Sequence, residues 1–280
     1  NYILNNITQY DVFISGNMES DIRIEIEKKT KEYLNYTSLL SEKNKKDTYA
    51  WINYKQLNIM CFGERGKTLN MSQENEIWYL ICNEDYSKCK LVIDEDYILN
   101  NEKIGCQIFN RPWLQRLYNA YVGLGSRFIM HGACISLDNK NGMILLGDSG
   151  AGKSTACEIV KSTGNLCISD DRVIVEIIDD KLYCYASPWN IKNPHLTNNK
   201  KLRVEKILFL YHGNNEYKSI DKFNEFCKNF SKQIIHSNIY SKQSVLKWKI
   251  EKSIEAYNIT QSYKVEFTPD KSFLKLIKVI

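Results

Sequence analysis

The chain has 280 residues, of which 43% are hydrophobic, 25% are charged and only four are proline; this composition is typical of one or two globular domains and excludes a disordered or fibrous protein. The net charge of +5 is spread in small lysine clusters rather than gathered in a basic stripe, which argues against a nucleic-acid partner. No run of about 20 apolar residues is present, so we expect no membrane-spanning helix and no membrane partner.

The N-terminal residues and the cysteines bear on the cellular compartment. The opening NYILNNITQYDVF has no cationic start, apolar core or small-residue cleavage site, so no signal peptide is expected, and a first residue other than Met is consistent with a trimmed start. The nine cysteines are odd in number, and none lies in a C-x-x-C pair or a His/Cys cluster with metal-ligand spacing. We therefore expect reduced thiols in a cytoplasmic protein.

Residues 1–110 are predicted to form a small β-rich (α+β) accessory domain. Four segments alternate between apolar and polar residues with a period near two, which is typical of half-buried strands; they are residues 10–16, 22–29, 51–62 and 77–82. A polar loop at 41–50 interrupts them. This region holds no set of residues with catalytic spacing, so we expect it to bind a partner, such as the substrate.

Residues 111–280 are predicted to form an α/β domain around a mixed, hairpin-containing sheet flanked by helices. Pro112 suits the first turn of a helix, and the residues after it are apolar at helical spacing. Two hairpins are expected, one from strands 128–137 and 143–147, and one from strands 172–178 and 181–187 turned at Asp179 and Asp180. The other expected elements are a helix closed by Gly164, a strand at 166–169, a strand at 206–212, helices across about 219–258, and a last strand and short helix at 263–277.

A phosphate-binding loop (Walker A motif, or P-loop) follows the first hairpin. The segment GDSGAGKST matches G-x-x-x-x-G-K-[ST] without a mismatch, and its residues are Gly147, Asp148, Ser149, Gly150, Ala151, Gly152, Lys153, Ser154 and Thr155. Glycines let the backbone N–H groups turn toward the phosphates; Lys153 would bridge the β- and γ-phosphates, and Ser154 would bind Mg²⁺. ATP and Mg²⁺ are therefore the expected substrate and cofactor.

Asp170 and Asp171 end the strand at 166–169, one helix and one strand after this loop. In this position one carboxylate can reach the metal and the other can face an incoming nucleophile. The alternative is a solvated turn between strands. Two adjacent like charges at a strand end are costly unless a cation compensates them, which favours the functional interpretation.

His131 lies on the strand 128–137, which is expected to pair with the strand that enters the loop. An imidazole there is within reach of the γ-phosphate or of the acceptor. The alternative is a histidine whose hydrogen bonds are satisfied inside the core.

These three motifs, in the order HGACIS, GMILLGDSGAGKSTACEIV and LCISDDRVIVE, resemble the HPr kinase/phosphorylase family, whose core is similar to that of phosphoenolpyruvate carboxykinase. The resemblance covers roughly residues 112–280. The segments ASPW, KILFLYHG and YKVEFTPDKSFLKLI look like the second half of HPr-kinase-related peptide kinases that accompany lasso-type and other modified peptides.

The resemblance implies roles for single residues. Lys153 and Ser154 would hold ATP and Mg²⁺, and Asp171 would assist the metal. Asp170, helped by His131, would orient or deprotonate a serine hydroxyl. The sequence leaves open which aspartate takes which part, and it leaves open a homo-oligomer.

One stretch departs from the family. Bifunctional HPr kinase/phosphorylases carry L-E-I-R-G-x-G downstream of the aspartate pair, where this chain has YASPWNIKNPHLTN. The departure argues against phosphorylase activity and against HPr as the substrate. Trp189, Lys192 and His195 in this stretch are candidates for an acceptor site, with a packing Trp and a surface Lys as the alternative; Arg203 is interpreted as a solvent-facing arginine.

The function expected from the sequence is that of a kinase that transfers the γ-phosphate of ATP to a serine hydroxyl on a peptide. Three alternatives stay open. The acceptor could be HPr, it could be free serine or another small molecule, or the chain could be a regulatory module that binds a nucleotide without turning over an acceptor.

Overall fold

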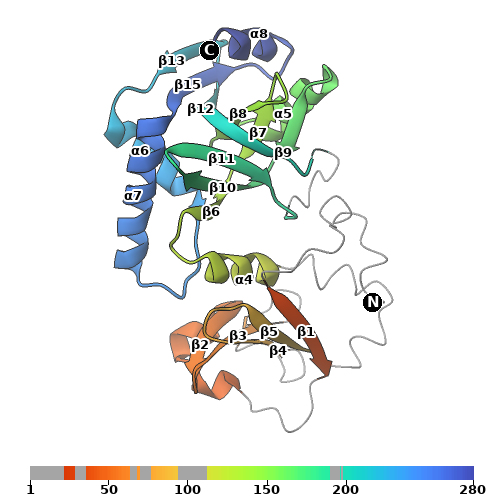
Figure 1. Cartoon of the computed structure of the whole chain (residues 1–280), viewed down its shortest axis with the longest axis vertical. Coiled ribbons are helices and arrows are strands. Elements are labelled where there is room, and N and C mark those ends of the chain that lie inside the picture. Colours follow the sequence, from red (N-terminus) through yellow and green to blue (C-terminus); the bar gives the residue numbers. More distant parts are fainter. Residues whose placement is uncertain are drawn as a thin grey trace. The chain divides into compact units, whose positions relative to one another are not determined.

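The computed structural model describes residues 22–28, 36–63, 68–69, 77–93, 112–189, 196 and 198–280 (Figure 1). This part of the chain is mixed α/β and divides into two units, the first ending at Tyr121 and the second beginning at Val122. Among these residues no helix is both long and apolar enough to cross a membrane. The strand predicted at 10–16 lies outside the described residues.

The N-terminal unit is built on a five-stranded sheet in the order β1-β5-β4-β3-β2. β1 is parallel to β5, and the other neighbours are antiparallel. Its elements are β1 (Arg23–Lys28), the short 3-10 helix η3 (Tyr36–Leu39), α1 (Glu42–Lys45), β2 (Tyr49–Tyr54), β3 (Leu57–Gly63), β4 (Ile77–Cys82), β5 (Lys88–Ile93) and α4 (Pro112–Val122).

Two predictions for this unit were wrong in detail. The alternating run at 51–62 is not one strand but the hairpin β2–β3, turned at Lys55 and Gln56 with φ of 48° and 65°. A two-residue turn with positive φ at both positions favours Asn or Gly, and neither residue type marks this turn in the sequence. The segment at 41–50, predicted as a loop, contains α1 and the start of β2.

The helix α4 belongs to the N-terminal unit rather than to the domain that follows it. Trp113 and Leu117 are buried in one cluster with Trp78 and Leu91 of the first sheet. The apolar face of α4 is thus covered by the sheet that precedes it in the chain. The division between the units therefore falls after Tyr121, later than the boundary at residue 110 expected from the sequence.

The second unit is built on a ten-stranded mixed sheet in the order β14-β6-β10-β11-β12-β8-β7-β9, with β15 also beside β12 and β13 beside β15. Its strands are β6 (Arg127–His131), β7 (Ala133–Ser136), β8 (Asn141–Leu146), β9 (Leu166–Ser169), β10 (Arg172–Ile178), β11 (Lys181–Ala186), β12 (Lys201–His212), β13 (Glu216–Ser219), β14 (Ile234–Ile235) and β15 (Gln261–Phe267). Its helices are α5 (Lys153–Ser162), α6 (Phe223–Gln233), α7 (Lys242–Ile259) and α8 (Ser272–Val279).

Helices cover both faces of this sheet, and β8 lies between them. Successive side chains of a strand point to opposite faces. Ile144 and Leu146 of β8 accordingly pack in the cluster that contains Phe226 and Phe230 of α6, whereas Leu145 packs with Ala156 of α5. α7 shares the first of these faces and α8 the second. The strand that leads into the phosphate loop is therefore buried on both sides.

Both predicted hairpins are present, but the strand predicted at 128–137 is divided at Gly132. The part before Gly132, β6, pairs with β10, and the part after it, β7, pairs with β8 and β9. A Cβ atom at Gly132 would lie 2.8 Å from the Leu146 side chain and 3.1 Å from the Leu145 carbonyl oxygen. The chain changes from one set of partner strands to another at Gly132, where only glycine lets the backbone lie this close to β8.

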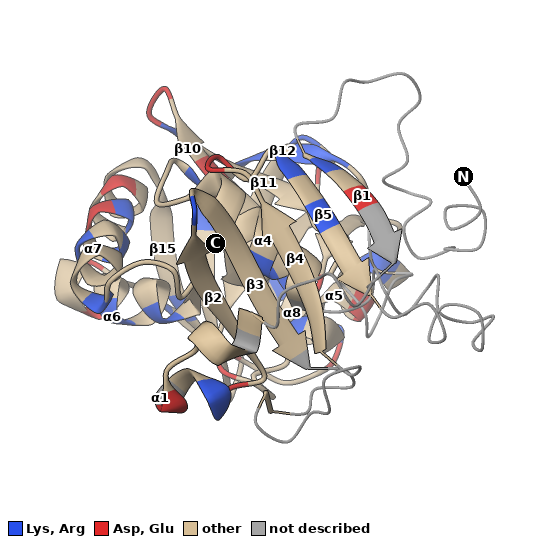
Figure 2. Cartoon of the chain, turned by 90° about the horizontal axis from the view of Figure 1, so that it is seen from below, with Lys and Arg blue, Asp and Glu red and all other residues tan. Residues whose placement is uncertain are grey.

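Charged side chains of both signs are interspersed on the surface. Figure 2 shows acidic and basic residues mixed along α7, where Lys247 lies 3.9 Å from Glu251 and Lys252 lies 2.7 Å from Glu255. This arrangement agrees with the even spread of charge in the sequence.

Candidate functional site

The phosphate loop joins the end of β8 to the start of α5. Asp148, Ser149 and Gly150 are exposed, and the loop is held in shape by a hydrogen bond from the Ala151 N–H to the Asp148 carbonyl (3.1 Å). Gly150 and Gly152 have φ of +85° and +91°, a conformation that glycine adopts readily. The loop predicted from the sequence is thus present, and it is open to solvent at its tip.

The first turn of α5 has free donors. Gly152 occupies the N-cap position, and no side chain accepts a hydrogen bond there. The first N–H groups of a helix have no partner within the helix, and the helix dipole adds positive potential at this end. With Ser154 and Thr155 in the first turn, the start of α5 can bind a phosphate.

Lys153, the first residue of α5, is buried, and only 6% of its surface is exposed. Nζ donates hydrogen bonds to the carbonyl oxygens of Gly147 (2.8 Å) and Asp148 (3.0 Å). Burial lowers the pKa of Lys153, while the negative charges of Asp171 and Asp148 act in the opposite direction. The side chain of the lysine is thus folded back on the loop, where its ammonium group is held by two backbone carbonyls.

Three strands end at the same edge of the sheet. β7 is antiparallel to both β8 and β9, and β12 is parallel to β8, so β8, β9 and β12 all point the same way. The carboxyl ends of parallel strands form the usual ligand-binding edge of such sheets. This edge therefore carries the phosphate loop after β8, Asp170 and Asp171 after β9, and His212 at the end of β12.

His131 is brought to the acidic pair by β10 rather than by the strand that enters the loop. It pairs in register with Arg172, and the Gly132 N–H donates to the Asp171 carbonyl (3.1 Å). The Nε2 atom of His131 lies 3.5 Å from Oδ1 of Asp171. The prediction that a neighbouring strand places His131 near the site identified the wrong strand.

The two aspartates have different environments. Asp170 is 1% exposed, whereas a quarter of the Asp171 side chain is exposed. Oδ1 of Asp171 also accepts a hydrogen bond from Nη1 of Arg172 (2.9 Å). The resemblance implies that His131 assists Asp170, and in the structure His131 lies beside Asp171.

Three further residues lie beside the loop or the acidic pair and were not predicted from the sequence: Lys232, His212 and Arg172. Nζ of Lys232, on α6, donates to Oδ1 of Asp148 (2.5 Å), and this hydrogen bond lowers the pKa of Asp148. Nε2 of His212 donates to the Gly150 carbonyl (2.7 Å). Only Arg172 has a sequence signal, since it follows the aspartate pair directly. The other two come from segments far along the chain.

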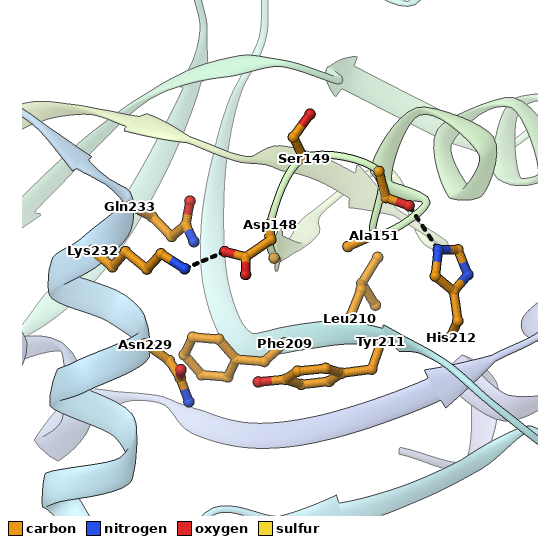
Figure 3. A pocket seen from close by; sticks show the side chains of 12 residues that line it. Asp148, Ser149, Ala151, Phe209, Leu210, Tyr211, His212, Asn229, Lys232 and Gln233 are labelled. Atoms are coloured by element: carbon orange, nitrogen blue, oxygen red, sulfur yellow. Dashed lines mark hydrogen bonds and ion pairs between the residues drawn. The ribbon is translucent and has the colours of Figure 1, made fainter.

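A pocket adjoins the loop on the side of β12 and α6 (Figure 3). Its volume is about 290 Å³. The residues around it are Gly147, Asp148, Ser149, Gly150, Ala151, Phe209, Leu210, Tyr211, His212, Asn229, Lys232 and Gln233. In the sheet, β12 lies on one side of β8 and β9 lies on the other. The pocket and the acidic pair are therefore on opposite sides of the loop that follows β8.

The residues at this edge fit Mg²⁺ bound together with a nucleotide. In the described part of the chain, no group of three or more His, Cys, Asp or Glu side chains is arranged to hold a metal. The available donors are the Ser154 hydroxyl and the carboxylates of Asp170 and Asp171, which are oxygen ligands of the kind that Mg²⁺ prefers. Protein sites for Mg²⁺ commonly supply one or two carboxylates and leave the other positions to substrate phosphates and water.

Of the remaining candidates from the sequence, the structure describes Trp189 and Arg203. Trp189 is buried, as expected for a packing residue, and Lys192 and His195 lie outside the described residues. The side chain of Arg203 is half exposed, 4.0 Å from Glu205. Among the described residues no cysteine is in a disulfide, and all of these cysteines but Cys227 are buried.

No protein-family model and no curated protein matches the chain. Among solved structures, the chain is similar to the HPr(Ser) kinase/phosphatase from Coxiella burnetii, with a TM-score of 0.34 and 11% sequence identity over 54% of this chain and 86% of that chain. A similarity of this size carries no weight for activity or residue roles. What is known of the site comes from the residues of this chain.

Proposed function

We propose that the chain is a Mg²⁺-dependent kinase, with a core of the HPr kinase/carboxykinase type, that transfers the γ-phosphate of ATP to a serine hydroxyl of a ribosomally made peptide. The observation that carries the proposal is that the loop with Lys153 and the pair Asp170–Asp171 follow strands that end at one edge of the second sheet, where a third segment places His131 3.5 Å from Asp171. A loop that binds phosphate and a carboxylate–imidazole pair beside it are the parts that phosphoryl transfer needs.

In the proposed reaction, the serine oxygen forms a bond to the γ-phosphorus while the bond from that phosphorus to the β–γ bridging oxygen breaks, and ADP leaves. The loop N–H groups and Lys153 hold the phosphates and offset their negative charge. Bound Mg²⁺, held through Ser154 and a carboxylate, would supply further charge neutralisation. Positioning and charge compensation account for most of the catalysis in this class of reaction.

The proton of the serine hydroxyl passes to the exposed carboxylate in this proposal. Asp171 is reachable from solvent and lies 3.5 Å from His131, so it suits an acceptor that arrives from outside. Asp170 is almost fully buried and suits the metal side of the site. These roles exchange the two aspartates relative to the expectation from the family resemblance.

The peptide acceptor rests on the family resemblance rather than on the site. Within the described residues, β1 and β2 are the edge strands of the N-terminal sheet. An extended peptide can add to a strand edge through main-chain hydrogen bonds. We assign the recognition of the peptide to this unit as part of the same proposal.

The test is mass spectrometry of three acceptors incubated with purified protein and Mg-ATP: a serine-containing peptide, HPr and free serine. We expect one added phosphate on the peptide, and we expect Asp171→Asn to reduce the rate about 100-fold or more, the usual loss when a positioned acid–base group is removed. Asp180→Asn is the matched control, because it makes the same change at the exposed turn at the far end of β10.

If only HPr or free serine gains a phosphate, the peptide acceptor is wrong, but the kinase activity stands. Transfer to none of the three acceptors, with ATP still bound, would favour a regulatory nucleotide-binding module. An unchanged rate in Asp171→Asn would remove that residue from the reaction.

A further inference from the structure

The pocket between β12 and α6 is lined by two side-chain amides, those of Gln233 and Asn229. Gln233 is 6% exposed and lines the pocket, and its side chain has no hydrogen bond among the described residues. The Gln233 amide therefore has donors and an acceptor available to a ligand in the pocket.

A second amide lies one helical turn away. Asn229 and Gln233 are four residues apart on α6, so their side chains lie on the same face of the helix. Figure 3 shows both on the side of α6 that faces the loop and β12. Asn229 also lines the pocket and has no side-chain hydrogen bond among the described residues. Two amides can thus bind one ligand.

The opposite wall of the pocket is aromatic. Phe209 and Tyr211 are two residues apart on β12 and share one face of the sheet. Phe209 is buried, while Tyr211 is 39% exposed, with Nζ of Lys264 5.1 Å from its ring centroid. An aromatic wall facing amide groups suits a flat heterocycle that stacks on a ring and presents hydrogen-bonding atoms at its edge.

The pocket is continuous with the phosphate loop, since Gly147 and Ala151 belong to its wall. At about 290 Å³ it is near the lower limit of small-molecule pockets, roughly 300 Å³, and suits one ring system rather than a whole nucleotide. The acidic pair lies on the other side of β8, so a nucleotide could keep its phosphates in the loop while its base enters this pocket.

We propose that this pocket binds the base of the nucleotide and selects adenine over guanine through the amides of Gln233 and Asn229. Adenine presents an amino donor beside a ring-nitrogen acceptor, and one amide pairs with both. The proposal places the N7 edge of the base against the amides; on that edge guanine presents two neighbouring acceptors, N7 and O6, which pair best with a cation. Two cations lie at the pocket, and both are paired with carboxylates: Lys232 with Asp148, and Lys264, beside Tyr211, with Glu266. This inference rests on the proposed function, because it assumes that the loop holds a nucleoside triphosphate.

The test is calorimetric binding of Mg-ATP, Mg-GTP and Mg-tripolyphosphate, which needs no phosphoryl transfer. We expect ATP to bind about tenfold more tightly than GTP, and Gln233→Leu to weaken ATP about tenfold, as expected for one or two lost hydrogen bonds. Tripolyphosphate has no base, so its affinity should be equal in wild type and variant, which also shows that the variant is folded. Asn224→Leu, at an exposed position of α6 outside the pocket, is the matched control.

Equal affinities for ATP and GTP, or an unchanged ATP affinity in Gln233→Leu, would overturn the base site while leaving the phosphate loop intact. Selective ATP binding without transfer to any acceptor would instead overturn the kinase and keep the base site. If neither nucleotide nor tripolyphosphate binds, both proposals fail.

Discussion

At the scale of single residues, Gly150 and Gly152 of the phosphate loop have nearly the same φ, +85° and +91°, but different surroundings. A Cβ atom at Gly152 would lie 2.6 Å from the ring of Phe267 on β15, whereas a Cβ at Gly150 would have no atom within 4 Å. Gly150 is thus needed for its backbone alone. Gly152 is also needed because α5 begins directly against an aromatic ring.

We therefore predict that Gly152→Ala destabilises the second unit more than Gly150→Ala does. A left-handed conformation costs a non-glycine residue roughly 1–2 kcal/mol at either position. The contact with Phe267 adds about 1–3 kcal/mol at Gly152 only, as is usual for overpacking. Thermal unfolding of both variants without nucleotide measures the difference. If both variants lose the same stability, the Phe267 ring moves aside without an energetic penalty and the prediction is wrong.

Residues of the candidate site could be predicted from the sequence where they belong to a local motif. The loop and Asp170–Asp171 are contiguous in sequence, and the structure places both at one edge of the sheet. Lys232 and His212 could not be predicted, because they reach the loop from a helix and a strand far along the chain. The sequence also does not show that Asp170 is buried and that Asp171 lies beside His131.

At the scale of secondary-structure elements, the turn of the β7–β8 hairpin is organised by one carboxylate. Oδ1 of Asp138 accepts hydrogen bonds from the N–H groups of Lys140 and Asn141, each 2.8 Å long, and from the Ser136 hydroxyl (3.0 Å). These hydrogen bonds, the backbone ones above all, lower the pKa of Asp138 to about 2. The charged carboxylate thus fixes the turn that leads into β8.

From this lowered pKa we predict a pH-dependent contribution to stability. Since the pKa of Asp138 is about 2 in the folded state and 3.8 for an ordinary aspartate carboxyl group, the unfolded state binds more protons between these values. The stabilisation is therefore complete above about pH 4 and is lost as the pH falls through 2. The turn is exposed, so screening by solvent keeps the contribution to about 1 kcal/mol.

Unfolding of Asp138→Asn by urea at pH 7 and at pH 2.5 measures this contribution. We expect the variant to be less stable than wild type at pH 7 and the difference to shrink at pH 2.5. Asp180→Asn, in the turn of the neighbouring hairpin, is the control and should show no such change, because its side chain has no hydrogen bond among the described residues. A difference that is independent of pH would assign the effect to the side-chain shape rather than its charge.

The elements that the sequence predicted best are those with a local turn signal. The β10–β11 hairpin turns at Asp179 and Asp180, as predicted, with φ of 51° and 52°. Lys55 and Gln56 adopt the same kind of turn without such residue types, so β2 and β3 were predicted as one strand. The division at Gly132 also had no local signal, because it follows from the approach of Leu145 and Leu146.

At the scale of the whole molecule, non-local strand pairing creates the candidate site. β12 pairs with β8, and β7 lies between β8 and β9, so residues near 150, 170 and 212 share one edge of the sheet. Strand order of this kind has no periodic signature in the sequence. The same limit applies to α4, whose helical spacing could be predicted but whose packing on the N-terminal sheet could not.

The central claim is that this edge of the sheet transfers phosphate and does not merely bind it. The most direct measurement is a ³¹P NMR time course of Mg-ATP with the protein and a serine-containing peptide. We predict that the ATP resonances decline while those of ADP and of a phosphate monoester grow in equal amounts. An ATP spectrum that is broadened by binding but constant in time would contradict the claim, and so would ADP accompanied only by inorganic phosphate.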